Sequence, residues 1–241
     1  MSAPHQHQQP QSQSQPHPHP HPHAEHVQHE QHEQVDEGGE RYWDGRYGES
    51  DRIWSGDANA ALVRETSQLP PGRALDLGCG EGGDAIWLAR RGWRVTGTDI
   101  SGVALERAAG HAAEAGVGDL VEWRRHDLAE SFPAGEFDLV SACFLHTYGE
   151  FPRERILRTA AAAVAPGGTL LIVGHGGWAS WQENPHPEVH FPTPGEVVEQ
   201  LELPEGDWEV PVAEEHERIQ EQPDGTPGTR TDNAVKVRRL R

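Results

Sequence analysis

Residues 73–83 have the sequence RALDLGCGEGG, in which a short apolar run leads directly into four glycines. An apolar run that ends in glycines is typical of a strand buried in a parallel sheet. The glycines at 78, 80 and 82 let the backbone approach a ligand where a Cβ atom would clash. Residues 84–91 follow with apolar side chains in helical register. The stretch therefore predicts a strand, a loop that binds a ligand and the positive amino-terminal end of a helix.

Downstream of this stretch, apolar runs alternate with helix-length segments. We expect helices over residues 102–115 and 153–164, and strands over residues 94–100, 120–124, 137–143 and 169–173. Strands that are separated by helices in this way form a parallel sheet with helices on both faces.

The last third of the chain has a different pattern. Thr193 and Glu196 form a capping box that predicts a helix to about Leu201. Residues 208–218 and 229–240 resemble two long strands with turn residues between them, so we expect an antiparallel hairpin. The predicted fold class is α/β: a Rossmann-like doubly wound sheet, mostly parallel, with a C-terminal antiparallel hairpin.

Composition limits the partners and the compartment. The formal net charge of −19 argues against nucleic acid, because neutralising phosphates requires a basic surface. Two cysteines make no disulfide framework and favour a reducing compartment. No run of about 18 apolar residues is present, and no secretory signal is recognisable. We expect a soluble, cytoplasmic protein without a membrane partner, and by default a monomer.

The first 40 residues differ from the rest. Residues 1–37 contain nine His, nine Gln and six Pro, a composition that cannot bury enough apolar surface to fold. We interpret residues 1–40 as a disordered tail and residues 41–241 as one domain. The simpler role of the tail is solvation, and weak binding of divalent metals by its imidazoles is the alternative.

Two acidic residues bear on the cofactor. Asp99 ends the second predicted strand, where a carboxylate can accept the hydroxyls of a ribose. This feature and the glycine spacing also fit a dinucleotide. Asp76, beside the loop, would repel a pyrophosphate but could engage an amino group. In addition, the domain leaves no room for the separate substrate domain that many nicotinamide enzymes carry.

Four segments together resemble class I S-adenosylmethionine-dependent methyltransferases: residues 75–82, 95–99, 137–140 and 165–171. Their order and spacing cover the predicted domain. Residues 42–47 and 53–55 also resemble the branch of thiopurine and tellurite methyltransferase-like proteins. The resemblance implies S-adenosyl-L-methionine as the cofactor, a methyltransferase activity, and a small-molecule methyl acceptor.

The resemblance also implies roles for individual residues. The methionine part of the cofactor would lie against Asp76, Gly78, Cys79 and Gly80. Its ribose would bind Asp99, and its adenine would lie against Ile100, Asp127 and Leu128. The segment from Ala142 to His146, which includes Cys143, would lie near the transferable methyl group. No metal ligands are implied.

Methyl transfer from a sulfonium is an in-line displacement, so alignment and exclusion of water are the main requirements. His146 is our candidate general base, and His175 is a second one. A structural or solvent-facing role is the alternative for both. For Cys143 a role as a small buried residue is favoured over one as a nucleophile.

Aromatic residues suggest a lid. Trp43, Tyr47 and Trp54 could cover the cofactor, or pack an N-terminal helix on the sheet. The long loop over residues 174–192 contains Trp178, Trp181, His186 and His190, and we expect it to close over the acceptor. For Arg52, Arg153 and Arg155 we expect positions on the solvated surface, with contact to an anionic acceptor as the alternative.

These features favour a methyltransferase that acts on a small molecule. One alternative is an NAD(P)-dependent oxidoreductase on the same fold. The other is a metal-handling protein that acts through its histidine-rich tail.

Overall fold

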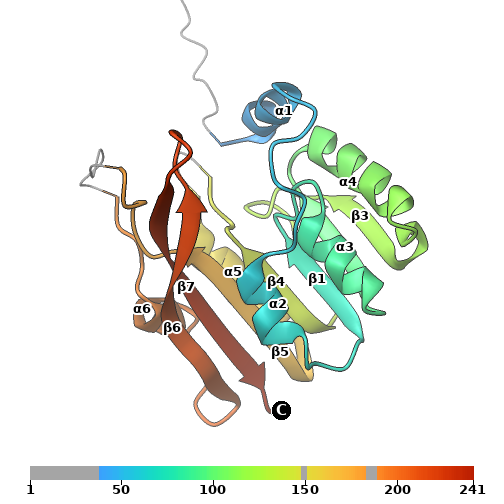
Figure 1. Ribbon diagram of the computed structural model, residues 1–241. Helices are drawn as coiled ribbons and strands as arrows, with labels where there is room; N and C mark the ends of the chain where they lie inside the picture. The colour runs from blue at the N-terminus through green and yellow to red at the C-terminus, as the bar shows by residue number, and fades with distance from the viewer. Residues whose placement is uncertain (1–37, 148–150, 183–188) are drawn as a thin grey trace, which may run out of the picture. The chain divides into compact units, whose positions relative to one another are not determined.

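The computed structural model describes residues 38–147, 151–182 and 189–241, so residues 1–37 of the predicted tail and His186 lie outside the described residues. Within these ranges, seven strands form one sheet in the order β3-β2-β1-β4-β5-β7-β6 (Figure 1). The strands are β1 (Arg73–Leu77), β2 (Arg94–Asp99), β3 (Val121–Arg125), β4 (Phe137–Cys143), β5 (Val164–His175), β6 (Trp208–Glu221) and β7 (Pro227–Arg239). The helices are α1 (Glu40–Gly48), α2 (Ala60–Thr66), α3 (Gly83–Arg90), α4 (Gly102–Glu114), α5 (Arg153–Ala162) and α6 (Pro194–Gln200), with a 3₁₀ helix, η1 (Gly118–Leu120).

The first five strands are parallel, and β1 lies between β2 and β4. Successive side chains of a strand point to opposite faces, so each strand contributes to two cores. Leu75 and Leu77 of β1 belong to one buried cluster, whereas Ala74 belongs to the other. In β5, Leu170 and Leu171 divide in the same way. The predicted doubly wound sheet is confirmed.

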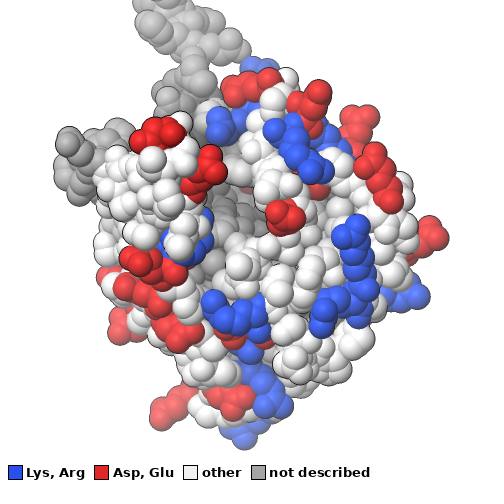
Figure 2. Space-filling model, viewed as in Figure 1, with Lys and Arg blue, Asp and Glu red and all other residues white. Residues whose placement is uncertain are grey.

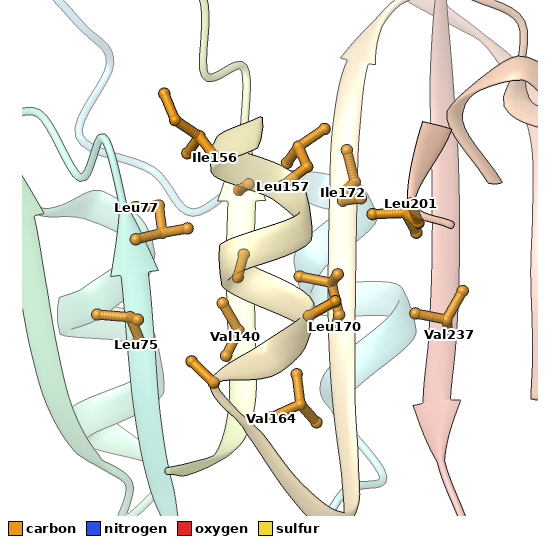
Figure 3. Close-up of a cluster of buried hydrophobic side chains, with 14 of the residues drawn as sticks. Leu75, Leu77, Val140, Ile156, Leu157, Val164, Leu170, Ile172, Leu201 and Val237 are labelled. Carbon is orange, nitrogen blue, oxygen red and sulfur yellow. The ribbon is translucent and has the colours of Figure 1, made fainter. Parts of the chain in front are cut away.

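Helices cover both faces of the sheet. The cluster around α2 and α3 fills one face, and the cluster around α5 and α6 fills the other. Figure 3 shows Ile156 and Leu157 of α5 in one cluster with Val140 of β4 and Ile172 of β5. All four side chains are at most 2% exposed, which makes this helix a main contributor to the core.

The C-terminal hairpin is also confirmed. Strands β6 and β7 are antiparallel, and β7 continues the sheet antiparallel to β5. One boundary differs from the prediction: β5 begins at Val164 instead of residue 169, and α5 ends at Ala162. The reason is local pairing, because the Phe137 N–H donates to the Ala163 carbonyl (2.9 Å) and Phe137 pairs with Val164.

Two short helices precede the sheet. In Figure 1, α1 lies beyond the ends of the strands at which β1 and β4 terminate. Helix α2 was not predicted; its N-cap is Asn59, whose side-chain oxygen accepts hydrogen bonds from the amides of Ala61 and Leu62. None of the described helices has the length and apolar character needed to cross a bilayer.

Charges of both signs are interspersed on the face shown in Figure 2. Acidic side chains gather over the hairpin, where β6 carries five Glu residues in its sequence WEVPVAEEHERIQE. A continuous basic surface is not seen among the described residues of this face.

Candidate active site

The glycine loop after β1 lies so close to Tyr47 and Trp54 that a side chain on the loop would not fit between them. Gly80 has φ +51°, and a Cβ atom there would lie 2.9 Å from the Tyr47 hydroxyl and 3.5 Å from Trp54 Nε1. At Gly82, with φ +88°, a Cβ atom would lie 2.8 Å from the Trp123 ring. The predicted need for glycine is therefore explained by both the backbone conformation and the available space.

Asp99 holds the loop in place. One of its carboxylate oxygens accepts the Gly80 N–H (2.9 Å), and the other accepts the Ser101 N–H (3.0 Å). Burial raises the pKa of this carboxyl, and the amide donors partly oppose that rise. The structure thus brings together two residues that the sequence placed in one site. Each oxygen retains a lone pair that a ligand hydroxyl could use.

Asp76 is a buried acid with an unused acceptor. One oxygen accepts the Ser141 hydroxyl (2.9 Å), and the other has no hydrogen-bond partner in the described part of the chain. Burial raises the pKa of Asp76 well above its usual value, and the nearby Asp84 raises it further. A cationic donor such as an ammonium group at the unpaired oxygen would favour the ionised carboxylate and offset this rise.

Cys143 lies beside these acids. Its thiol is close enough to Asp84 for the two groups to interact, and the Asp84 carboxylate accepts the Asn59 N–H (2.6 Å). Burial raises the pKa of the Cys143 thiol, and the charges of Asp84 and Asp76 raise it further. Burial likewise raises the pKa of Cys79, in the loop itself. Both cysteines are therefore thiols rather than thiolates, which supports the expectation that Cys143 is not a nucleophile.

The lid residues contact one another over the loop. The Trp54 indole donates to the Tyr47 hydroxyl (3.1 Å), and Tyr47 is only 4% exposed, whereas Trp54 is 49% exposed. Burial and the charge of Asp99 raise the pKa of Tyr47, so the phenol stays protonated. This geometry is compatible with the expectation that Tyr47 and Trp54 cover the cofactor.

Glu81 anchors the lid, and the sequence reasoning missed it. Its carboxylate accepts the amides of Ile53 and Trp54, each at 3.1 Å, and forms an ion pair with Arg107 (3.0 Å). Glu81 is only 4% exposed. The signal in the sequence was a Glu between the glycines of the loop, but the partners of Glu81 lie far away in the sequence.

Helix α1 is tied to the strand ends by two further residues. Asp44 accepts the Ser101 hydroxyl (2.6 Å), at the start of α4. The Trp43 indole donates to the Thr147 hydroxyl (3.1 Å), just after β4. These bonds place α1 over the carboxyl ends of β2 and β4, where ligands bind in sheets of this type.

The predicted adenine residues lie next to Asp99. The His126 N–H donates to the Asp99 carbonyl (3.0 Å), which brings Asp127 close to the half-buried Ile100. The exposed Asp127 carboxylate accepts the Ala129 N–H (2.9 Å). Leu128 packs against the core beside α5. Contact of these residues with an adenine stays a prediction.

Both candidate bases lie together at the ends of β4 and β5. The rings of His146 and His175 are stacked with centroids 5.4 Å apart, and the Phe144 ring is 4.6 Å from His175. His175 Nδ1 contacts the Asp232 carboxylate at 2.9 Å. Desolvation lowers the pKa of His146 to about 4, and the charges of His175 and Arg153 contribute. His146 is nevertheless exposed by its accessible surface, so its ring lies at the surface of the domain and not in the core.

Phe144 has a strained backbone, with φ +53°. Its N–H donates to the Val173 carbonyl (2.8 Å), so pairing with β5 continues through the strained residue. Strain in a non-glycine residue concentrates at functional sites, and Phe144 lies two residues before His146.

The described part of the segment over residues 174–192 runs along β7. The Gly176 and Ser180 amides donate to the carbonyls of Thr231 and Thr229 (2.9 Å each). A Cβ atom at Gly228 would lie 2.5 Å from the Trp181 ring, which therefore packs on the hairpin. Closure of this segment over an acceptor stays a prediction.

Of the three arginines expected on the surface, Arg52 and Arg155 are exposed, but Arg153 is half-buried. The Arg153 Nε atom is buried and has no hydrogen-bond partner in the described ranges. Arg153 begins α5 directly beside β5, and this neighbour could not be read from the helix pattern.

The arrangement as a whole defines a class of protein. A glycine loop after the central strand, an acid at the end of the next strand and a terminal antiparallel hairpin together form the class I methyltransferase fold. Residues 74–168 match the family model described as a methyltransferase domain. The matched segment contains the glycine loop and Asp99, and the predicted resemblance to class I S-adenosylmethionine-dependent methyltransferases is confirmed.

Curated relatives match part of their length. The chain is 34% identical over 116 residues to a probable tocopherol O-methyltransferase of Oryza sativa subsp. japonica, across 47% of this chain and 32% of that protein. It is 35% identical over 144 residues to a ubiquinone biosynthesis O-methyltransferase of Methylobacterium sp. (strain 4-46), across 53% and 57%. The chain thus spans about a third to somewhat over half of these relatives.

Solved structures agree on the fold. The structure described as "Conversion of a Disulfide Bond into a Thioacetal Group during Echinomycin Biosynthesis" has a TM-score of 0.63 and 26% identity, covering 83% of this chain and 92% of that one. TehB from Haemophilus influenzae has a TM-score of 0.61 and 19% identity, covering 83% and 66%. At the latter identity the likeness shows the fold alone.

Proposed function

We propose that this protein transfers a methyl group from S-adenosyl-L-methionine to a small-molecule acceptor. The observation that carries the proposal is Asp76, a buried carboxylate with an unused oxygen beside the glycine loop. It lies within the segment that matches a methyltransferase domain. The names of the relatives favour an oxygen atom as the nucleophile.

The residues of the loop fit this cofactor. Asp76 would bind its ammonium group, and Asp99 would bind the hydroxyls of its ribose. Gly80 leaves its peptide uncovered by a side chain, as close approach of a ligand requires. When bound, the cofactor supplies a methyl group made electrophilic by the sulfonium.

The chain itself would supply alignment and a dry site. Tyr47 and Trp54 would exclude water above the loop. The face of Trp54 can also favour a sulfonium by roughly 1 kcal/mol. The His146 ring is uncharged at a pH near 7, because desolvation lowers its pKa to about 4. The uncharged ring can accept a proton or a hydrogen bond from the acceptor.

The other two hypotheses gain nothing from the described residues. Asp76 disfavours the pyrophosphate of a nicotinamide cofactor, and the histidine-rich tail lies outside the described ranges.

The proposal is tested by following a labelled methyl group. The protein is incubated with methyl-labelled S-adenosylmethionine and with a cell extract separated into small molecules, protein and nucleic acid. We expect label in the small-molecule fraction, and much less with Asp99→Asn than with Asp119→Asn, a change at an exposed acid. Label confined to the protein or nucleic acid fraction would contradict a small-molecule acceptor.

A further inference from the structure

A group of cationic side chains lies beside His146. A Cβ atom at Gly174 would lie 3.6 Å from the His146 ring and 3.7 Å from Arg153 Nη2, so both side chains meet at the end of β5. Arg230 lies two residues from Asp232 on β7, and therefore on the same face of the strand; the Asp232 carboxylate contacts His175, whose ring is stacked on that of His146. Helix α5 and strand β7 thus supply the two arginines, and the segment after β4 supplies His146.

Arg153 and Arg230 have unused donors. The Nε atom of each is buried without a hydrogen-bond partner. In the part of the chain that the structure describes, neither guanidinium forms an ion pair. Burial lowers the pKa of both, yet they remain charged, since an arginine loses its proton only far above neutrality. A buried N–H group without a partner is costly, and a ligand that accepts a hydrogen bond from it would remove that cost.

The local acids are already engaged. Asp232 pairs with His175 at 2.9 Å and with the Arg218 Nε. Arg218 also donates to Gln220 (2.9 Å). Glu154 follows Arg153 on α5, but it is exposed. The surroundings of His146 therefore keep a surplus of positive charge, from Arg153 and Arg230, in a chain whose net charge is −19.

Flat rings lie beside His146. His146, His175 and Phe144 have ring centroids between 4.6 and 6.3 Å apart. Their faces suit a flat organic body, and guanidinium forks suit a carboxylate, which they bind through paired hydrogen bonds.

We propose that the methyl acceptor is an organic acid whose carboxylate binds Arg153 and Arg230, with its ring or chain against Phe144 and the two histidines. The inference rests on the proposed function and names the class of its acceptor. It also gives His146 a better chemical role. A carboxylate bound beside the ring offsets the arginine charges that lower its pKa, which moves the base toward neutrality, where general bases work best.

The experiment uses the full chain saturated with S-adenosylhomocysteine. Benzoate and the neutral benzamide are titrated at equal ionic strength, and binding is followed by the ring resonances of His146, assigned through their loss in His146→Gln. We expect benzoate to bind saturably and to raise the pKa of His146, with benzamide weaker by about tenfold or more.

Variants locate the site. Arg153→Gln and Arg230→Gln should each weaken benzoate by about tenfold or more, and Arg153→Lys by less. Arg155→Gln, an exposed arginine of the same helix, serves as the matched control and should bind as the wild type does. S-adenosylhomocysteine binding should stay unchanged in every variant, which shows that each is folded.

Three results would overturn the inference: equal binding of benzamide and benzoate, equal weakening by Arg155→Gln, or tighter binding of phenyl phosphate than of benzoate. Failure of the proposed function is distinguishable, because it would show as absence of S-adenosylhomocysteine binding to the wild type in the same samples.

Discussion

Replacing Gly80 by alanine tests whether the loop needs glycine for the reasons given. Its φ of +51° lies in the left-handed region, which costs a residue with a side chain roughly 1–2 kcal/mol. The new Cβ would also lie 2.9 Å from the hydroxyl of Tyr47, a side chain that is only 4% exposed and cannot simply move away. We expect Gly80→Ala to lower the free energy of unfolding by at least that backbone cost.

Gly110→Ala is the matched control. Gly110 lies in α4, where a Cβ atom would meet nothing within 4 Å, so alanine should stabilise the helix by roughly 0.5–1 kcal/mol. The same chemical change should therefore have opposite signs at the two sites, with a difference of about 1.5–3 kcal/mol. Urea unfolding followed by tryptophan fluorescence measures this, provided that the m-values agree.

A double variant separates the two causes. Tyr47→Phe removes the hydroxyl that the new Cβ would meet, but it leaves the backbone conformation unchanged. In Gly80→Ala combined with Tyr47→Phe, the steric part should be recovered and the backbone part should persist. If Gly80→Ala unfolded at the same urea concentration as the wild type, both parts of the reasoning would be refuted.

Three other predictions concern the core, the lid and His146. Leu157→Ala should lower the free energy of unfolding by about 2–5 kcal/mol with no change in cofactor affinity, because Leu157 is fully buried away from the loop; an equal loss of affinity would argue against this separation. Glu81→Gln should loosen the segment around Ile53 and speed its proteolysis relative to Glu106→Gln on exposed α4 surface, since the ion pair with Arg107 is lost; identical cleavage rates would show that Glu81 is no anchor. The wild type should lose stability relative to His146→Gln as the pH falls from about 6.5 to about 4, because in this window the unfolded ring binds a proton and the folded ring does not; parallel stability curves for the two proteins would contradict the lowered pKa.

The parallel core and the glycine loop could be predicted because their signals are local. The strand before the loop is apolar, and the left-handed backbone at Gly80 is a local reason for glycine, whereas its contact with Tyr47 is not. Asp99 was predicted for the same reason, since the acid lies at the end of the second strand. Boundaries were less certain where pairing decided them, as at Val164, which joins β5 because it faces Phe137.

Other parts of the site depend on segments that are distant in the sequence. Glu81 is a surface residue by type, and only the amides of Ile53 and Trp54 explain its burial. Arg153 stands at the start of an alanine-rich helix, and its partially buried position follows from packing beside β5. Such contacts arise from tertiary structure, which the periodicity of a single helix or strand does not encode.

The most direct test of the central claim is a calorimetric titration of the full chain with S-adenosylmethionine and, separately, with NADH. The account predicts micromolar binding of S-adenosylmethionine that is weakened by about tenfold or more in Asp76→Asn and in Asp99→Asn, but not in Asp119→Asn. It predicts no binding of NADH. Folded protein that binds NADH, or that fails to bind S-adenosylmethionine, would contradict the assignment of the loop as the site of a methyl donor.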